Sequence, residues 1–259
     1  MVKGVSVKFK SYEETIPKLL NVIKFNDEIK KHEQIVLKPN LINGNKEDST
    51  KVEFLESVLK FCMENKNPGT EIFIAEGCNG HDTMDIFNEF GYRKLAEKYG
   101  VSLIDLNKVE TEEIENEEFL RFENIFYPKV LVDSFVISLP LLRNDEEMEM
   151  SASLDNMLGA FPAKHYKSFF SKEKNKLKKW PLKYQIHDIL KCKMPNFALL
   201  DASEKGLIFA GQPLEIDKQA AKVLGLDWKS VGHLKLIDES FSDIRKIDKE
   251  VDNVIKERS

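Results

Sequence analysis

The sequence predicts an α/β fold with a mainly parallel, doubly wound sheet, in which helices cover both faces in a three-layer α/β/α arrangement. Short apolar runs typical of strands alternate with helix-patterned segments over the first hundred residues, and this order is the signature of βαβ crossovers. The chain has 259 residues, of which 42% are hydrophobic, enough to bury one large core. We therefore expect a single α/β domain over residues 1–259, with a β-rich and lysine-rich excursion in its middle.

The N-terminal part of the chain carries the clearest elements. Residues 5–9 alternate apolar and polar side chains, as a half-buried strand does. Ser11 followed by Glu14 predicts the start of a helix, because these two side chains can form a capping box. Further strands are predicted at residues 34–37, 71–75 and 101–106, and helices at residues 51–64 and 83–99, the second with a candidate break at Gly91.

Two segments in the second half depart from this pattern. Residues 110–118 hold six glutamates, which predicts a solvated loop, and two short strands that fit a hairpin follow up to residue 132. Residues 164–183 carry eight lysines and one glutamate, so we expect a lysine-rich lid or insertion over residues 160–190. The other predicted elements are strands at residues 133–140 and 197–201 and helices at residues 154–158 and 217–224.

Composition narrows the classes of protein. The net charge of −5 argues against a protein that coats nucleic acid, although it is compatible with a local basic patch. The three cysteines are widely spaced and form no CxxC pair, so neither an iron–sulfur cluster nor a structural zinc site is indicated. The sequence has no signal-peptide pattern and no apolar run near the roughly 18 residues that span a membrane. We expect a cytoplasmic protein with no membrane partner.

The loop Lys38-Pro39-Asn40 is the first candidate site. Ligands of open α/β sheets bind beyond the carboxyl ends of the strands, and this loop follows an apolar strand. Proline ends the strand, while Lys38 and Asn40 offer a charge and an amide to an anionic ligand. In the alternative interpretation, Asn40 satisfies backbone groups of the loop and Lys38 is a surface cation.

The loop at residues 76–82 is the second candidate. Its two glycines allow close backbone approach, and the following helix N-terminus can receive an anion. Glu76, His81 and Asp82 are candidate acid–base groups or metal ligands, although Asp82 can instead cap the helix. The loop has neither nucleotide fingerprint, GxGxxG or GxxxxGK[ST].

Polar residues beyond the other strands extend this set of candidates. Asp201 ends a strand and can reach the same crevice, as can Arg143, which follows another strand. Candidates further along the chain are Asn156, Lys164, His165 and His187. A lone histidine is more often structural than catalytic.

The lysine-rich segment is a separate candidate. Aromatic side chains lie between its lysines, a combination that suits nucleic acid or a phosphorylated ligand, although a solvated face is the favoured interpretation.

Short motifs in collinear order span nearly the whole chain. They are Val36-Leu37-Lys38-Pro39-Asn40-Leu41, Thr50, Ile74-Ala75-Glu76-Gly77, Phe90-Gly91-Tyr92, Leu95-Ala96-Glu97-Lys98-Tyr99-Gly100-Val101, Ile104-Asp105-Leu106, Ser138-Leu139-Pro140, Asn156-Met157-Leu158-Gly159, His187, Leu200-Asp201-Ala202 and Gly211-Gln212-Pro213-Leu214-Glu215-Ile216-Asp217. By these motifs the chain resembles the bacterial and archaeal family called domain of unknown function 362, whose members are often fused to ferredoxin-type iron–sulfur modules.

The resemblance implies a bacterial or archaeal protein and site residues at the shared motifs, but it implies no reaction, because the family is uncharacterised. This chain also departs from the family. Arg143-Asn144-Asp145 stands where members commonly have a Lys-x-His piece, which removes an expected metal ligand, and Asp155-Asn156 stands where they often read Lys-Asn. The ferredoxin cysteines are missing, so no iron–sulfur cluster is expected.

Two classes of function stay open, and the sequence does not decide whether the protein is an enzyme. One is an enzyme acting on a small anionic substrate, assisted by a divalent metal. In it, Glu76, His81 and Asp201 are catalytic, Lys38, Asn40, Thr50, Arg143, Asn156, Lys164 and His165 bind substrate, and His81, Asp82, His187 and Asp217 hold the metal. The other is a non-catalytic accessory protein whose residues 164–183 contact nucleic acid or a protein. The oligomeric state is not predicted.

Overall fold

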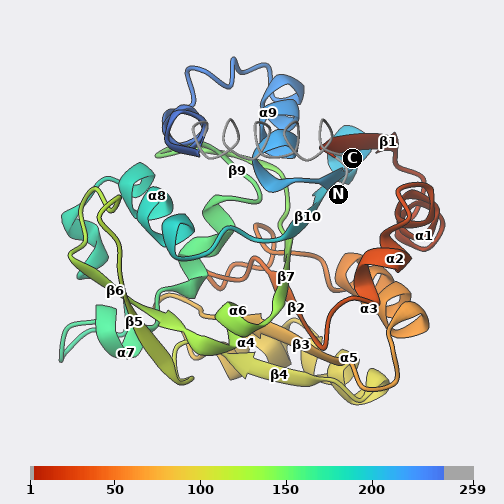
Figure 1. Cartoon of the computed structure of the whole chain (residues 1–259), viewed down its shortest axis with the longest axis horizontal. Helices are drawn as coiled ribbons and strands as arrows, with labels where there is room; N and C mark the ends of the chain where they lie inside the picture. The colour runs from red at the N-terminus through yellow and green to blue at the C-terminus, as the bar shows by residue number, and fades with distance from the viewer. Residues whose placement is uncertain (1–2, 242–259) are drawn as a thin grey trace, which may run out of the picture.

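The computed structural model describes residues 3–241, and its centre is a seven-stranded sheet. Its strands are β1 (Gly4–Lys8), β2 (Gln34–Pro39), β3 (Glu71–Glu76), β4 (Ser102–Asp105), β7 (Phe135–Leu139), β10 (Phe197–Ala202) and β11 (Leu207–Gly211), in the order β1-β11-β10-β7-β2-β3-β4 (Figure 1). Strand β11 pairs antiparallel with β1 and β10, whereas the pairs from β10 to β4 are parallel. The predicted α/β fold with a mainly parallel sheet is confirmed.

Hydrophobic side chains cover both faces of the sheet. In β2, Ile35 and Leu37 join one cluster and Val36 joins the other, because side chains alternate along a strand. The first cluster packs against α1 (Tyr12–Val22), α2 (Phe25–Ile29), α3 (Val52–Asn65), α4 (Thr83–Glu89) and α5 (Tyr92–Tyr99). The second packs against the 3-10 helix η1 (Asp155–Ala160), α8 (Leu182–Cys192) and α9 (Pro213–Val223). Figure 1 shows α1 to α3 on the right of the sheet and α8 on its left.

Local sequence signals explain where the early helices begin and end. The Ser11 side chain accepts a hydrogen bond from the Glu14 backbone N–H at 3.2 Å and so caps α1, as predicted. The other half of the predicted capping box differs, because the Glu14 carboxylate binds Lys10 at 2.7 Å. Gly91 separates α4 from α5 at the predicted break, with a φ of +91° that glycine adopts without steric cost.

The acidic segment forms a strand where a loop was predicted. Strand β5 (Thr111–Glu115) pairs antiparallel with β6 (Asn124–Pro128), and a short helix, α6 (Lys129–Asp133), follows. Glu113 and Glu115 are exposed, while Ile114 is partly buried between them. The loop prediction was wrong because a two-stranded ribbon needs only one apolar face, and its glutamates can stay in solvent. The predicted hairpin exists, but its first strand comes from the acidic segment and only its second lies within residues 119–132.

The second half also contains elements that the sequence did not indicate. Strand β11 was missed, and so was the small hairpin of β8 (Arg143–Asp145) and β9 (Glu149–Ser151). The lysine-rich segment contains a helical turn, α7 (Ala163–Tyr166), a 3-10 turn, η2 (Leu177–Lys179), and the start of α8. Helix α9 begins four residues before the predicted start, with Pro213 in its first turn. Among residues 3–241, no helix has the length and apolar character needed to cross a bilayer.

Candidate functional site

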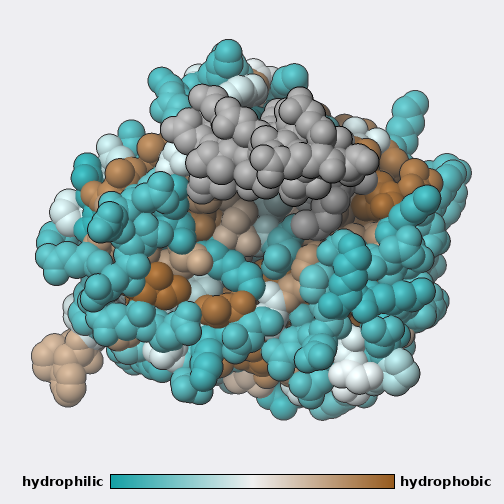
Figure 2. Space-filling view, viewed as in Figure 1, coloured by the Kyte–Doolittle hydropathy of each residue, from teal (hydrophilic) through white to brown (hydrophobic). Residues whose placement is uncertain are grey.

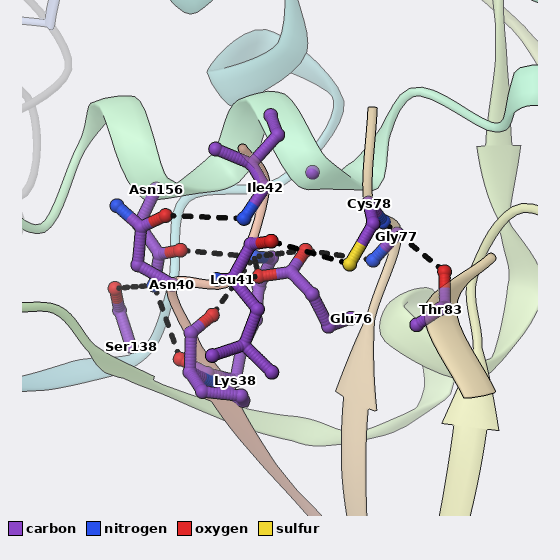
Figure 3. Close-up of polar contacts among 12 residues, drawn as sticks. Lys38, Asn40, Leu41, Ile42, Glu76, Gly77, Cys78, Thr83, Ser138 and Asn156 are labelled. Atoms are coloured by element: carbon purple, nitrogen blue, oxygen red, sulfur yellow. Dashed lines mark hydrogen bonds and ion pairs between the residues drawn. The ribbon is translucent and has the colours of Figure 1, made fainter. Parts of the chain in front are cut away.

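A fully buried ion pair joins the carboxyl ends of two neighbouring strands. Lys38 lies near the end of β2 and Glu76 ends β3, and parallel pairing brings the two side chains together. The Lys38 Nζ lies 3.0 and 3.1 Å from the two carboxylate oxygens of Glu76, and neither side chain is exposed (Figure 3). This pair lies within the first candidate site, but it has no contact with solvent.

Hydrogen bonds occupy the other polar atoms of the pair. The Glu76 carboxylate accepts from the backbone N–H groups of Leu41 at 3.0 Å and Gly77 at 2.7 Å. The Asn156 Oδ1 accepts from Lys38 Nζ at 3.0 Å, and its Nδ2 donates to the Lys38 backbone oxygen and to Ser138 Oγ (Figure 3). A buried charge is tolerated when it is paired and hydrogen-bonded in this way.

Glycine lets η1 approach the ion pair. A Cβ atom at Gly159 would lie 2.1 Å from Glu76 Oε1 and 2.8 Å from Lys38 Nζ. No side chain fits at residue 159, so the Gly159 backbone packs directly on the two charged groups.

Asn40 and Thr50 hold the loop after β2 in place. The Thr50 Oγ1 accepts from the Asn40 backbone N–H at 2.8 Å and donates to the Leu139 backbone oxygen. Both side chains are buried, and the Tyr92 hydroxyl donates to the Thr50 carbonyl at 2.7 Å. The Asn40 Oδ1 accepts from the Ile42 backbone N–H at 3.5 Å, which is the kind of loop contact that the structural alternative for Asn40 described.

A cavity of about 400 Å³, lined by both polar and apolar side chains, lies at the same end of the sheet. The loops after β2 and β3, the β8–β9 hairpin, η1 and the lysine-rich segment all contribute to its wall. The residues that line it include Asn43, Asn79, Arg143, Asp145, Asp155, Lys174, Lys178, Trp180 and Gln185. This is where the fold class places ligands.

Arg143 carries an unsatisfied donor at the cavity. Its Nη1 binds the Asp145 carboxylate at 3.0 Å, but its Nε is buried and has no hydrogen-bond partner among the described residues. Burial raises the pKa of Asp155 to about 6, although hydrogen bonds from Ser151 and Ala152 partly oppose this effect. The cavity wall therefore includes an arginine whose buried Nε–H lacks a partner among the described residues, and a carboxyl that can carry a proton near neutral pH.

Lys164 and His165, predicted to bind substrate, lie on α7 away from the residues that line the cavity. The Lys164 Nζ donates to the Val109 backbone oxygen at 2.5 Å. The His165 ring stacks on Phe126 with centroids 4.1 Å apart. In this structure His165 contacts the β5–β6 hairpin, and Lys164 binds the chain just before β5.

The four predicted metal ligands lie apart. Asp82 caps α4 and binds Lys108 at 2.8 Å, and the exposed His81 lies against Gly44. His187 is buried between Asp188 and Ser240, both at 2.7 Å. Asp217 accepts hydrogen bonds from Ser153 and Leu154, and burial raises its pKa to about 7. Within residues 3–241, no group of three or more His, Cys, Asp or Glu side chains is placed to hold a metal.

Asp201 is buried at the end of β10, where it accepts from the Tyr12 hydroxyl at 2.7 Å and from the Ser203 backbone N–H at 2.9 Å. It is not among the cavity residues. Sequence reasoning did not select Asn79, Asp155 or Lys174 for the site. Asn79 lies within the second candidate loop, so its position was a usable signal, whereas nothing local distinguishes Lys174 from the lysines around it.

Together, these features define a mixed α/β protein with a cavity of mixed polar and apolar lining at the carboxyl ends of its parallel strands. The family model described as "Domain of unknown function (DUF362)" matches residues 35–218. The chain belongs to this family, as its motifs predicted. Among curated proteins, none matches the chain. The matched region begins in β2 and ends in α9, so it contains both the buried ion pair and the cavity residues.

Proposed function

We propose that the protein binds a small anionic metabolite in the cavity and acts on it as an enzyme. The buried Nε of Arg143, which has no hydrogen-bond partner within residues 3–241, carries this proposal. Leaving a buried donor unsatisfied costs about 1–3 kcal/mol, and a carboxylate or phosphate oxygen from a ligand would remove that cost. A guanidinium suits this role because its N–H groups match the geometry of such anions.

Lys38, Asn40, Thr50 and Asn156 have a supporting role in this proposal. Their hydrogen bonds hold the loops after β2 and β3, which supply Asn43 and Asn79 to the cavity wall. Asp155 is the group best suited to acid–base chemistry, because it lines the cavity and its pKa lies near neutral pH. No step is assigned to a metal, because the four predicted ligands do not meet.

The test is a thermal-shift screen with small carboxylates and phosphates. A ligand present at 100 times its Kd adds about 2.7 kcal/mol to the free energy of unfolding. Arg143→Ala removes a charged hydrogen bond worth about 1.5–3 kcal/mol, so we expect affinity to fall roughly 10- to 100-fold. Lys164→Ala is the control and should bind like the wild type. Equal binding by the Arg143→Ala variant would contradict the proposal.

A second candidate function is an accessory protein that contacts an anionic partner through the lysine-rich segment. Seven of its eight lysines are exposed, and the exposed fractions of Phe169 and Phe170 are 92% and 98%. Figure 2 shows a small apolar protrusion at the lower left, where Figure 1 places the chain after α7. Retention on nucleic acid that weakens steeply with salt and with Lys167→Ala and Lys172→Ala would favour this candidate.

A further inference from the structure

Lys174 differs from the other lysines of its segment because its side chain is buried, with only 3% of the residue exposed. Its Nζ donates to the backbone oxygens of Gly77 at 2.7 Å and Gly159 at 3.3 Å. In the part of the chain that the structure describes, it forms no ion pair with a carboxylate. Lys38, which is equally buried, has Glu76 as its counterion.

The surroundings of Lys174 suit a neutral amine. An ammonium has three N–H donors, whereas a neutral amine has two donors and a lone pair. Two carbonyl oxygens therefore accept both N–H groups of the neutral form and leave its lone pair free, whereas one donor of the charged form lacks an acceptor. Burial lowers the pKa of Lys174 to about 8, and the positive charge of Lys38 acts in the same direction, against the opposing effect of Glu76.

Lys174 is also one of the residues of the cavity wall. It lines the cavity together with Asp155 and Arg143, and its backbone N–H donates to Asn79 Oδ1 at 2.7 Å. This backbone contact ties the lysine-rich segment to the loop after β3, so the side chain keeps one place in the wall. A lysine desolvated in a pocket and held near other cations is a typical amine nucleophile.

We propose that Lys174 is a nucleophile that forms a reversible imine with a small carbonyl compound, an aldehyde or a 2-oxo acid, in the cavity. The nitrogen lone pair attacks the carbonyl carbon, and the carbonyl oxygen takes a proton. The resulting carbinolamine loses that hydroxyl and the remaining N–H proton as water. The amine and the carbonyl compound thus give an imine and water, with no change of oxidation state.

Two neighbours have roles in this step. Asp155 can hold a proton near neutral pH and lines the same cavity, so it is the group that protonates the leaving hydroxyl. Arg143 would bind the carboxylate of a 2-oxo acid, and this part of the inference rests on the proposed function. An uncharged aldehyde has no carboxylate for Arg143 to bind, so it tests the reactivity of the Lys174 amine alone.

Reductive trapping tests the inference directly. The full chain is incubated with acetaldehyde or glyoxylate and sodium cyanoborohydride, which reduces an imine to a stable amine, and the adduct is located by peptide mass spectrometry. We expect preferential modification of Lys174 and its loss in Lys174→Arg. Lys178→Arg is the matched control, because Lys178 lines the same cavity but is exposed and paired with Glu173 at 2.6 Å.

The outcomes separate the two proposals. If acetaldehyde modifies Lys174 and glyoxylate modifies it no better, the result supports Lys174 as the nucleophile. The same result counts against Arg143 as the binding site for the carboxylate. Adducts spread over exposed lysines, unchanged in a folded Lys174→Arg variant, would overturn the inference and leave Lys174 as a purely structural contact of the lysine-rich segment. Carboxylates that have no aldehyde or ketone group cannot form an imine. Their effect on the melting temperature in the thermal-shift screen therefore tests anion binding by Arg143 independently of the Lys174 amine.

Discussion

The Lys38 ammonium and the Glu76 carboxylate lie 3.0 Å apart with no solvent contact, so each depends on the other for its charge to be compensated. Their hydrogen bonds extend to Asn156 and to the backbone of the loops after β2 and β3. At the scale of single residues, the pair positions the loops that contribute to the cavity wall. The groups proposed to contact the ligand are other residues.

Lys38→Met removes one partner and leaves Glu76 buried and unpaired. Breaking a buried pair in this way costs about 3–5 kcal/mol of unfolding free energy, which urea denaturation would measure. Lys98→Met is the control, because Lys98 pairs with Glu56 at the surface, where solvent screens the pair and its contribution to stability is small. A loss in Lys38→Met no larger than in the control would show that the buried pair is not formed.

At the scale of elements, η1 closes the site from above the sheet, and the lysine-rich segment adds Lys174 beside it. Both the Lys38–Glu76 pair and the Lys174 amine contact Gly159. The position of η1 therefore determines the geometry of both groups, and a change in this element should alter stability and ligand binding together.

Gly159→Ala tests this dependence. Its Cβ would lie 2.1 Å from Glu76 Oε1, so η1 must move, and overpacking of this kind costs about 1–3 kcal/mol. Gly69→Ala is the matched control, because no atom lies within 4 Å of the added Cβ, and its effect should stay within about 1 kcal/mol. Equal unfolding free energies for the two variants would mean that η1 does not pack on the ion pair.

At the scale of the whole molecule, Asp217 links α9 to the chain that enters η1, through its hydrogen bonds to Ser153 and Leu154. Burial raises its pKa to about 7 from the usual 3.8. The folded protein therefore binds more protons at this group than the unfolded chain does between these two values. Its contribution to stability falls as pH rises through that window.

Asp217→Asn keeps an oxygen acceptor but does not titrate. The difference in unfolding free energy between wild type and variant should shift in favour of the variant as pH rises from about 4 to about 7. Denaturation curves at several pH values in this range would measure it. A difference that stays constant with pH would show that the pKa of Asp217 is not raised.

Periodicity predicted most of the parallel sheet because each central strand is a short apolar run. It failed where an element has only one apolar face, as in β5, and where a short strand follows another closely, as β11 follows β10. Strand β11 can pair antiparallel with β10 because a turn at residues 203–206 reverses the chain. The polar residues of this turn occur in many kinds of loop, so they did not predict it.

The candidate site was predictable only in its location. Lys38 and Glu76 lie at the ends of strands that pair, so sequence placed them together, but their full burial depends on Asn156 and Gly159, 80 or more residues after Glu76 in the chain. Likewise, Lys174 becomes distinct only when its segment folds over Gly77. A metal site from His81, Asp82, His187 and Asp217 required a convergence that the topology does not produce.

A crystal structure with the best ligand of the thermal-shift screen tests the proposed site most directly. The ligand should lie in the cavity with an anionic oxygen within about 2.7–3.2 Å of Arg143 Nε, and its other groups facing Asp155 and Lys174. A ligand bound outside the cavity, on the exposed lysines or elsewhere, with Arg143 unchanged, would contradict the proposal.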